Sequence, residues 1–379
     1  MSQSTKIDFL YLSEQDMVKA GVTDMPACVD VMEEMFELLH RGDYRMAGPD
    51  NNSHGAPLFF PDEPEHPNMP ANGPDRRLMA MPAYLGGSFG TCGMKWYGSN
   101  IANKELGLPR SILMFILTDV VTSAPLALMS ANLLSAYRTG AIPGVGARHL
   151  ARQDSKVAAI LGPGVMGKTT LAAFIAACPG IDTLKLKSRG AASRDDFLQW
   201  VAENYPQITT IEHVDTVEAL VRDSDLISYC SSGDEGDPET YPRIKKAWAK
   251  PGAFFAMPSF ATADDDALQG DVRLVCDAIS IYDAWAEELP SPAHAICPMV
   301  GVQFMDLIAE GRLERDALED LGAIVAGDTP GRQNDEEIIV LSVGGMPVED
   351  VAWATHIYRT ALEKDIGVSL NLWDQPVLS

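Results

Sequence analysis

A glycine-rich stretch at residues 162–170, GPGVMGKTT, contains residue types that bind phosphate groups. Its spacing fits the G-x-G-x-x-G pattern that holds the pyrophosphate of a dinucleotide, through Gly162, Gly164 and Gly167. With Lys168 and Thr169 included, the stretch also fits G-x-x-x-x-G-K-S/T, the loop that wraps a nucleoside triphosphate. The first pattern predicts a redox enzyme and the second predicts an NTPase, so the surrounding residues must decide.

The two patterns make different demands on the strands that follow the loop. A triphosphate loop needs a second strand that ends in Asp and holds the magnesium shell. Asp277 follows the apolar run RLVC, but strands followed by Asp are common, so this support is weak. A dinucleotide site instead needs a residue that contacts the adenosine ribose, roughly 20 positions beyond the glycines.

The expected ribose position falls at Lys187-Ser188-Arg189, where the second strand ends. An NAD-selective site carries Asp or Glu there, whereas Ser188 flanked by two cations suits a 2′-phosphate. Lys168 lies in the first turn of the following helix, where we expect it to add charge to the pyrophosphate site. These residues favour NADP or NAD as the cofactor, with a preference for NADP.

Strands and helices alternate from residue 156 onward, which is typical of a Rossmann-type, doubly wound parallel sheet. The alternation runs through KVAAILG, GKTTLAAFIAAC, TLKLKSR, FLQWVAENY, TTIEHV, VEALVRD, LISYCSS, GAFFAMP and RLVCDA. Upstream, four closely spaced runs predict a mixed or antiparallel sheet: RLMAMPAYL, CGMKWYGSN, SILMFILTD and APLALM. Between the two regions, residues 132–151 predict a long helix rich in small residues. We therefore expect an α/β protein.

The first 45 residues predict a short strand, FLYL, and then two helices. Ser13 and Asp16 have the spacing of a helix cap. Residues 47–76 are rich in Pro, Asn, Asp and Gly and are not expected to form a core element. This segment is interpreted as either a disordered excursion or a lid over the active site, and its length does not distinguish the two.

The composition limits the classes of partner. The 379 residues include 53 acidic and 29 basic side chains, which gives a net charge of −24. Such a charge repels phosphate backbones and anionic membranes, so we expect no nucleic-acid or membrane partner. The hydrophobic share of 46% and the charged share of 22% are ordinary for a globular protein of more than one domain.

The six cysteines are scattered and include no C-x-x-C pair, so neither a disulfide framework nor a metal site is expected. The N-terminal stretch MSQSTKIDFLYLSEQD lacks a basic region followed by an apolar run, and no apolar run approaches the roughly 20 residues that span a bilayer. These features predict a cytoplasmic location.

Six motifs occur in one order along the chain: GMKWYGSN, LPRSILMFILTD, APLALMSANLLSAYRTGA, ILGPGVMGK, SDLISYCSS and GGMPVEDVAWA. Together they resemble the ornithine cyclodeaminase/μ-crystallin family, nearly from end to end of the chain. The long 47–76 segment and the MPVEDVAWAT ending are most similar to a subgroup that carries a tyramine oxidase label. The resemblance implies hydride transfer between a nicotinamide and a carbon that bears an amine or imine next to a carboxylate. The resemblance therefore favours a dinucleotide over a nucleoside triphosphate as the ligand of the glycine-rich stretch.

The resemblance also implies the domain organisation. Residues 131–331 would form the dinucleotide-binding Rossmann domain, inserted in an α+β domain for substrate binding and dimerisation that comprises residues 1–130 and 332–379. A homodimer is expected on the same ground.

Two residues are expected to hold the substrate. Lys95 in GMKWYG matches the family lysine that meets the substrate carboxylate, and a lysine among apolar residues on an inner strand needs an anionic partner. Arg138 in YRTGA matches the arginine that grips the same carboxylate. Asp350 matches a family acidic residue, although a charge at a helix N-terminus explains it more simply. The expected cofactor-binding residues are Thr139, Gly162, Gly164, Val165, Met166, Gly167, Ser188, Arg189, Ser231 and Gly345.

One departure from the family pattern concerns carboxylate binding. The family usually has a further carboxylate-binding arginine near residue 50, where this chain has Asp50 or Asn51. The candidates to replace it are Arg45, Arg76 and Arg77, and His54 offers a different recognition group.

A second departure concerns acid–base chemistry. The catalytic Asp of the cyclodeaminases would fall at Ala261 or Thr262, neither of which titrates near neutral pH. The acidic run at residues 264–266 comes slightly later and is more typical of a helix cap.

Three functions are consistent with these residues. The leading hypothesis is an NAD(P)-dependent oxidoreductase that acts on the C–N bond of an α-amino or α-imino acid, as an imine reductase or amino-acid dehydrogenase. The second is an ornithine cyclodeaminase-type ammonia-lyase that uses NAD. The third is a non-catalytic cofactor-binding subunit or small-molecule binder.

Overall fold

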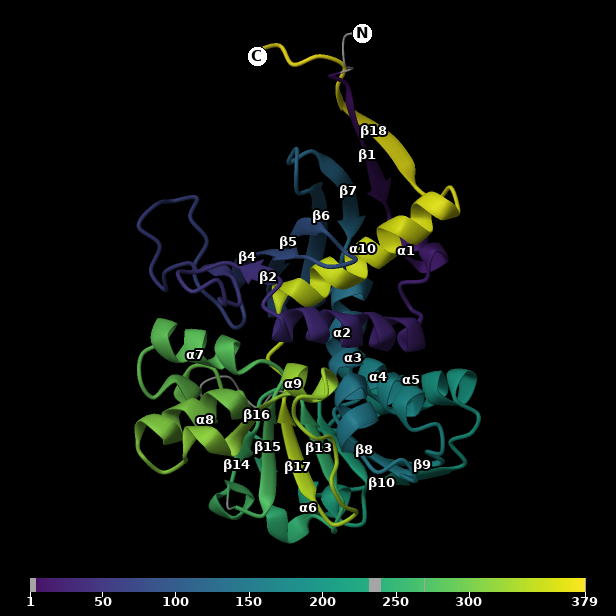
Figure 1. Cartoon of the computed structure of the whole chain (residues 1–379), viewed down its shortest axis with the longest axis vertical. Helices are drawn as coiled ribbons and strands as arrows, with labels where there is room; N and C mark the ends of the chain where they lie inside the picture. Colours follow the sequence, from purple (N-terminus) through teal and green to yellow (C-terminus); the bar gives the residue numbers. More distant parts are fainter. Residues whose placement is uncertain (1–4, 232–239, 269, 379) are drawn as a thin grey trace. The chain divides into compact units, whose positions relative to one another are not determined.

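The computed structural model describes residues 5–231, 240–268 and 270–378 of the chain (Figure 1). The chain divides into two compact units. Unit 1 consists of Met1–Asp24, Arg41–Ser135 and Met346–Ser379, and unit 2 consists of Met25–His40 and Ala136–Gly345.

Unit 1 is built on an eight-stranded, mostly antiparallel sheet in the order β18-β1-β7-β6-β5-β4-β2, with β3 also paired to β4. Its strands are β1 (Ile7–Leu12), β2 (Tyr44–Met46), β3 (Ala56–Leu58), β4 (Arg77–Leu85), β5 (Thr91–Ser99), β6 (Ser111–Asp119), β7 (Pro125–Ser130) and β18 (Val368–Trp373). The four runs predicted to form strands are β4 to β7, and antiparallel pairing joins each to the next.

One face of this sheet is covered by helix α10 (Pro347–Glu363), as Figure 1 shows. The residues of β4 to β6 that face it are buried, because successive side chains of a strand point to opposite faces. We call this covered side the inner face. Trp353 of α10 is fully buried, and its indole N–H donates to the Val22 carbonyl oxygen at 3.3 Å.

Helix α1 (Glu14–Ala20) has the predicted cap. The Ser13 side chain accepts from the Asp16 N–H, and the Asp16 carboxylate accepts from the Ser13 N–H at 3.2 Å, which forms a capping box. The helix ends at Gly21, whose φ of 98° places it in the left-handed region that favours glycine.

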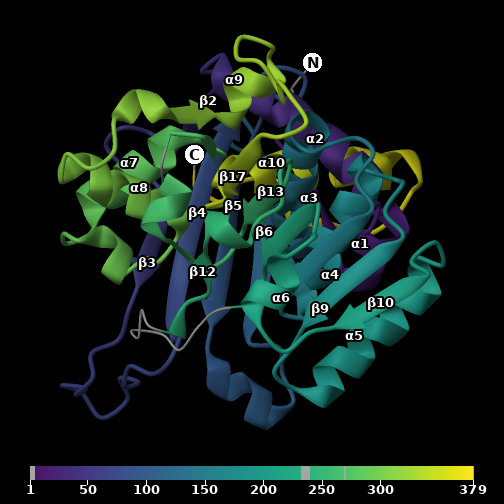
Figure 2. The ribbon, with the colours of Figure 1, turned by 90° about the horizontal axis from the view of Figure 1, so that it is seen from below.

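The 47–76 segment is partly a strand. Residues 56–58 form β3, which pairs with β4 along the same edge as β2, and residues 59–72 form a largely exposed loop of unit 1 (Figures 1 and 2). Its C-terminal end is fixed by Asp75, which pairs with Arg77 and Arg110. A lid role for this segment stays a prediction.

Unit 2 holds an eight-stranded parallel sheet in the order β10-β9-β8-β11-β13-β17-β15-β16. Its strands are β8 (Val157–Leu161), β9 (Thr183–Lys187), β10 (Thr210–His213), β11 (Leu226–Tyr229), β13 (Phe254–Met257), β15 (Val272–Cys276), β16 (Leu318–Asp320) and β17 (Ile338–Ser342). A further short pair joins β12 (Arg243–Ile244) to β14 (Thr262–Ala263). This is the predicted Rossmann-type, doubly wound parallel sheet.

Seven α-helices of the described residues lie wholly in unit 2: α2 (Met25–His40), α4 (Val165–Ala177), α5 (Ala191–Asn204), α6 (Val217–Val221), α7 (Ile279–Glu288), α8 (Val300–Ala309) and α9 (Leu321–Val325). Among them, α4, α5 and α6 are the helices predicted between the strands. Helix α3 (Asn132–Leu150) continues from unit 1 into unit 2. Its glycines allow close packing, because a Cβ at Gly140 would lie 2.3 Å from the Thr169 side chain of α4.

The unit boundaries differ from those expected. The strand at 338–342 was expected in the substrate domain, but as β17 it pairs in parallel with β13 and β15. The chain therefore leaves the Rossmann sheet after residue 345 rather than after 331. Helix α2 also groups with unit 2, where it packs against α4 and α9. A buried strand of Ile and Val fits either sheet equally well, so its sequence did not reveal its partner strands.

Candidate active site

The glycine loop of unit 2 joins β8 to α4 in the way a dinucleotide turn requires. Gly162 has a φ of 98°, and a Cβ there would lie 2.8 Å from the Ser231 Cβ at the end of β11. A Cβ at Gly167 would lie 2.3 Å from the Gly162 carbonyl oxygen. Two of the three glycines are therefore required by backbone conformation or close packing.

Gly164 is different, because a Cβ built there would meet nothing within 4 Å. It is the N-cap of the 13-residue helix α4, whose first residues are Val165 and Met166. The first N–H groups of a helix have no intrahelical acceptor and attract anions. The open space before this helix end fits a dinucleotide pyrophosphate, with backbone N–H groups as the donors.

Lys168 does not add the free charge that we expected at this site. Its Nζ lies 2.7 Å from the Asp196 carboxylate and 5.7 Å from the centre of the Trp200 ring. Both partners belong to α5, so the lysine joins two helices and its charge is largely offset.

The predicted ribose-binding residues follow β9. Ser188 is half-buried, and its Oγ lies 3.3 Å from His213 Nε2, while Arg189 is exposed. Lys187 Nζ donates to the Asp215 carbonyl oxygen at 2.6 Å. In the described part of the chain, the residues next to Ser188 are thus the cations Lys187 and Arg189 and the ring of His213, and no carboxylate accepts a hydrogen bond from the Ser188 hydroxyl.

Asp277, at the end of β15, has a structural role rather than the magnesium-binding role of an NTPase. Its carboxylate is fully buried and accepts hydrogen bonds from the N–H groups of Gly344 and Gly345 and from the Tyr282 hydroxyl. Burial raises the pKa of Asp277 to about 6, while these hydrogen bonds act in the opposite direction. Within the described ranges, no group of three or more His, Cys, Asp and Glu side chains is arranged to hold a metal.

The turn that Asp277 holds lies against Arg138. Gly345 has a φ of 77°, and a Cβ there would lie 2.9 Å from Arg138 Nη1. Arg138 is 4% exposed and lies on α3, next to Thr139. Unit 2 therefore brings Ser231 next to the glycine loop and Arg138 next to Gly345. The glycine loop, Ser231 and Gly345 follow the carboxyl ends of β8, β11 and β17, the edge at which such sheets bind ligands.

Unit 1 supplies Lys95, on the inner face of β5. Lys95 Nζ donates to Asp350 Oδ2 at 2.8 Å and to Ser135 Oγ at 3.2 Å. The Lys95 side chain is 3% exposed and that of Asp350 is not exposed. Asp350 is therefore the anionic partner that a buried lysine needs, and the simpler explanation of a helix N-terminal charge was incomplete.

The three candidate arginines are held differently. Arg45 donates to the carbonyl oxygens of Gly42 and Tyr44, and Arg76 lies over the Phe60 ring. Arg77 begins β4, with its guanidinium carbon 5.9 Å from the centre of the Tyr97 ring. Lys95 Nζ is 5.7 Å from the same ring centre, so of the three arginines Arg77 shares a neighbour with Lys95.

The region where a cyclodeaminase would carry its Asp contains a histidine that the sequence reasoning missed. His294 Nε2 lies 3.2 Å from the Ala261 carbonyl oxygen, and burial lowers the pKa of His294. Asp264 is paired with Arg243 and Lys245, so these cations hold it away from a role as the replacement base. The histidine lies 33 residues beyond Ala261 in the sequence, and no local pattern links the two.

The parallel sheet and the glycine turn that follows its strand β8 are those of a dinucleotide-binding protein. The chain belongs to the ornithine cyclodeaminase/mu-crystallin family, whose model matches residues 21–365. This confirms the resemblance inferred from the six motifs.

Three similar proteins illustrate this membership. N-((2S)-2-amino-2-carboxyethyl)-L-glutamate dehydrogenase from Staphylococcus aureus is 28% identical over 370 residues, which cover 97% of this chain and 99% of that protein. Thermococcus litoralis Delta(1)-pyrroline-2-carboxylate reductase, solved with NADH and L-proline, superposes with a TM-score of 0.74 at 23% identity, covering 96% of this chain and 100% of that one. An archaeal alanine dehydrogenase dimer with bound NAD gives 0.73 at 22% identity, with coverage of 97% and 100%. None of these three carries the tyramine oxidase label.

Proposed function

We propose that this protein is an NAD(P)-dependent oxidoreductase that interconverts an α-imino acid and the corresponding α-amino acid. The observation that carries the proposal is a glycine turn with the close packing that a dinucleotide site requires, in a chain that buries Lys95 at the position of the family's carboxylate-binding lysine. The relatives named above are dehydrogenases and a reductase of amino and imino acids.

In the proposed reaction, an iminium carbon gains a hydride and becomes the α-carbon of the amino acid, and the cofactor is oxidised from NAD(P)H to NAD(P)⁺. The imine nitrogen takes its proton from solvent before the transfer. A bound nicotinamide supplies the hydride. The residues proposed to hold the dinucleotide are Thr139, Gly162, Gly164, Val165, Met166, Gly167, Ser188, Arg189, Ser231 and Gly345.

Lys95 and Arg138 are proposed to bind the substrate carboxylate, because they match the family residues that have this role. The planar fork of an arginine suits both oxygens of a carboxylate, and the ammonium of a lysine adds a point charge. The two residues bind and orient the substrate, and no proton transfer is assigned to them.

The test of this function is a screen of 2-oxo acids with ammonia or methylamine and with NADPH or NADH, followed by absorbance at the nicotinamide band. Reduction by the wild type and a loss of roughly 30-fold or more in kcat/KM for Lys95→Met are expected, since removing one of a charged pair costs ~2–5 kcal/mol. Absence of reduction with every acid would leave the chain as a cofactor-binding protein.

Ornithine cyclodeamination is not expected. That reaction needs a base for the substrate amine, and the aspartate of the family pattern would fall at Ala261 or Thr262. His294 is a titratable group in contact with this position, so His294→Ala is the variant to test if lyase activity occurs. Proline and ammonia formed from L-ornithine with catalytic NAD(P) would show that the assignment to reduction is wrong.

We propose that NADP(H) binds more tightly than NAD(H). Ser188 takes the place of the acidic ribose ligand, and Arg189 beside it is exposed, so a 2′-phosphate can approach its guanidinium. The dissociation constants of NADPH and NADH, measured by nicotinamide fluorescence, test this preference. Tenfold tighter binding of NADH, about 1.4 kcal/mol, would contradict it.

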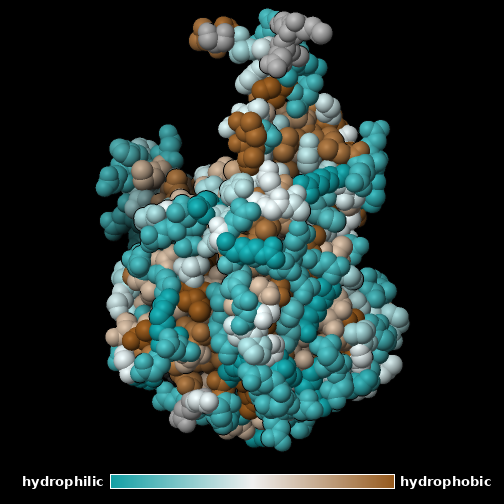
Figure 3. Space-filling model, viewed as in Figure 1, coloured by the Kyte–Doolittle hydropathy of each residue, from teal (hydrophilic) through white to brown (hydrophobic). Residues whose placement is uncertain are grey.

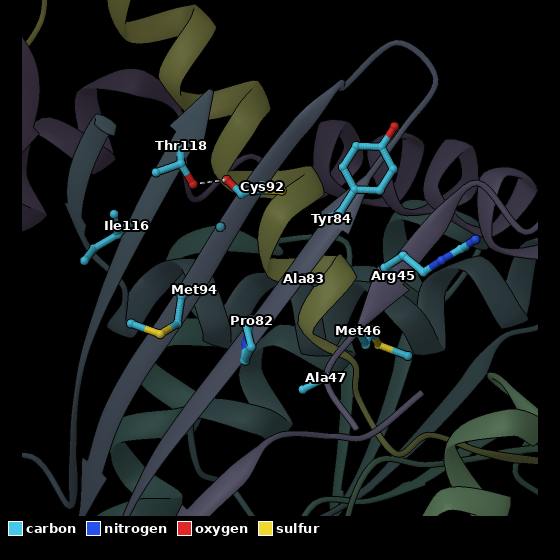
Figure 4. A pocket seen from close by; sticks show the side chains of 11 residues that line it. Arg45, Met46, Ala47, Pro82, Ala83, Tyr84, Cys92, Met94, Ile116 and Thr118 are labelled. Atoms are coloured by element: carbon cyan, nitrogen blue, oxygen red, sulfur yellow. Dashed lines mark hydrogen bonds between the residues drawn. The ribbon is translucent and has the colours of Figure 1, made fainter. Parts of the chain in front are cut away.

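A homodimer is proposed through the outer face of the unit 1 sheet. This face exposes Trp96, Ile112, Met114 and Ile116, with exposed fractions of 37–50%. A cavity of about 420 Å³, lined mainly by β4, β5 and β6, opens on the same face, with the side chains shown in Figure 4. Apolar side chains also lie along β1 and β18 (Figure 3). Exposed apolar patches of this kind mark interaction surfaces, and the similar alanine dehydrogenase is a dimer.

The oligomeric state of Met114→Glu tests the dimer. Light scattering after gel filtration is expected to give a dimer for the wild type and a monomer for this variant. Ile211→Glu is the control, because Ile211 is 43% exposed on β10 of the other unit. A monomeric wild type would contradict the proposal.

Among the described residues, no helix has the length and apolar character needed to cross a membrane. A cytoplasmic location stays a prediction, consistent with six free cysteines.

A further inference from the structure

We propose that His213 binds the 2′-phosphate of NADP(H) together with Ser188 and Arg189, so that a residue of β10 helps to determine which cofactor the protein prefers. This inference rests on the proposed function, to which it adds a third side chain. It starts from the edge of the parallel sheet of unit 2, where β10 pairs with β9.

The strand register brings His213 to the ribose position. Strands β9 and β10 are parallel neighbours, and their carboxyl ends lie side by side (Figure 2). His213 is the last residue of β10 and lies opposite Leu186, two positions before Ser188. Residues two positions apart in a strand point to the same face, so His213 and Ser188 are expected on one face. Their contact agrees with this register, because Ser188 Oγ lies 3.3 Å from His213 Nε2.

The charged side chains of the alternate positions have partners of their own. Lys185 Nζ lies 3.9 Å from a carboxylate oxygen of Glu212, and Lys187 Nζ donates to the Asp215 carbonyl oxygen at 2.6 Å. Lys185 and Glu212 alternate with the row that contains Ser188, so they belong to the opposite face of the sheet. The Glu212 carboxylate is therefore not placed to hold a ribose hydroxyl beside Ser188.

The His213 ring is accessible to a ligand. His213 and Arg189 are exposed, and Ser188 is half-buried. In the described ranges, the Ser188 hydroxyl is the one hydrogen-bond partner of the ring. A protonated imidazole has two N–H donors, so with Nε2–H donating to Ser188 Oγ, the Nδ1–H group remains for an anion. A bound phosphate favours this protonated form, because an opposite charge nearby stabilises the imidazolium.

The local charge also suits a phosphate, although the chain has a net charge of −24. Two carboxylates of the adjoining helix α5 have cationic partners, since Asp195 pairs with Arg194 and Asp196 pairs with Lys168. NADPH and NADH differ in the 2′-phosphate alone. A donor that contacts this phosphate therefore strengthens the binding of NADPH and leaves that of NADH unchanged.

The experiment measures the Kd of NADPH and of NADH by nicotinamide fluorescence. The proteins are the wild type, His213→Ala, His213→Lys and Ile211→Ala. Ile211 is the matched control, because it lies two positions before His213 on the same strand and is 43% exposed.

His213→Ala is expected to raise the Kd of NADPH about 3- to 10-fold, the range for one hydrogen bond to a charged group at an exposed site, and to change the Kd of NADH less than about twofold. His213→Lys should bind NADPH within about threefold of the wild type, because it restores a cationic donor. Ile211→Ala should change neither constant. The melting temperature should not change in these variants, because both positions are exposed.

Two results would overturn the inference while leaving the preference for NADP(H) intact. The first is NADPH binding that does not weaken in His213→Ala. The second is an equal weakening of NADPH and NADH, which would place the ring against a part that both cofactors share.

A wild type that binds NADH more tightly would show instead that the proposed preference is wrong, and a role for His213 would fail with it. Asp215→Asn would then identify the ribose ligand, because Asp215 is the exposed acidic residue that follows β10. A loss of NADH affinity in Asp215→Asn would assign the ribose hydroxyls to that carboxylate. If neither cofactor binds to the wild type, both the proposed function and this inference are wrong.

Discussion

Lys95 Nζ donates a hydrogen bond to Asp350 Oδ2 at 2.8 Å, and the two side chains are almost completely shielded from solvent. The residues are 255 positions apart in the sequence. One lies on the inner face of β5 and the other in the first turn of α10, so the pair joins the sheet of unit 1 to the helix that covers it.

This buried ion pair predicts strong coupling between its two members. Lys95→Met removes the ammonium group that donates to a buried carboxylate, so we expect a loss of about 3–5 kcal/mol in the free energy of unfolding. The double variant Lys95→Met/Asp350→Leu should be more stable than the sum of the single variants indicates. Urea unfolding of the four proteins measures the coupling.

The exposed pair Lys6–Asp8 is the control for this cycle, because its atoms lie at the same 2.8 Å but both side chains are exposed. Its coupling is expected to fall within the error of the measurement. Additive effects of the Lys95 and Asp350 substitutions would show that burial does not strengthen the pair.

Two glycines of the turn between β8 and α4, which is proposed to bind the pyrophosphate, should respond differently to the same substitution. Gly164→Ala places a methyl group in open space before α4, so stability should stay within about 0.5 kcal/mol. The methyl group would obstruct the pyrophosphate, and the Kd of NADPH should rise roughly tenfold or more. Gly162→Ala should instead destabilise the protein by about 1–3 kcal/mol, because its φ is positive and Ser231 is close.

Thermal unfolding and fluorescence titration separate these two effects. If Gly164→Ala binds NADPH as tightly as the wild type, the pyrophosphate does not lie at this helix end.

Gly345 is expected to position Arg138. In Gly345→Ala, the new Cβ approaches Arg138 Nη1, the far end of a flexible side chain, so the guanidinium shifts. Gly327→Ala is the matched control, because Gly327 has a similar φ of 83° but no atom within 4 Å of a built Cβ. Both variants should lose about 1 kcal/mol or more from backbone strain.

A rise in KM for the imino acid should occur in Gly345→Ala and not in Gly327→Ala, and steady-state kinetics of the two variants measures it. Equal KM values would mean that the arginine does not bind the substrate or has not moved.

The raised pKa of Asp277 predicts that the free energy of unfolding depends on pH in a specific way. Burial raises its folded-state pKa to about 6, above the value of 3.8 for an exposed aspartate. The folded protein therefore binds this proton more tightly, and the contribution to stability is present below pH 3.8 and lost as the pH rises through about 6. A shift of about two pKa units corresponds to about 3 kcal/mol.

The variant Asp277→Asn does not titrate at this position. Between about pH 4 and pH 7.5 the wild type should lose up to about 3 kcal/mol of unfolding free energy relative to the variant. Chemical denaturation of both proteins at several pH values measures this difference. A difference that is constant across this range would mean that the carboxylate has an ordinary pKa in the folded protein.

The sequence by itself determined the features that depend on local patterns. Strands β4 to β7 were predicted from closely spaced apolar runs, the Ser13–Asp16 cap from residue types three positions apart, and the glycine loop from a motif whose steric demands are met within a few residues. The alternation of strands and helices similarly predicted the parallel sheet, because helices that cross over such a sheet need regular spacing.

Only the tertiary structure decided which distant residues meet. Strand β17 joined the Rossmann sheet rather than the sheet of unit 1, because a uniformly apolar strand can pair in either environment. Arg77 was one of three candidate arginines until the β4–β5 register placed it beside Tyr97. Asp350 likewise acquired its role from Lys95, since the packing of α10 on the sheet brings the two charges together. Periodicity in a sequence reports which face of an element is apolar, but it does not report what packs against that face.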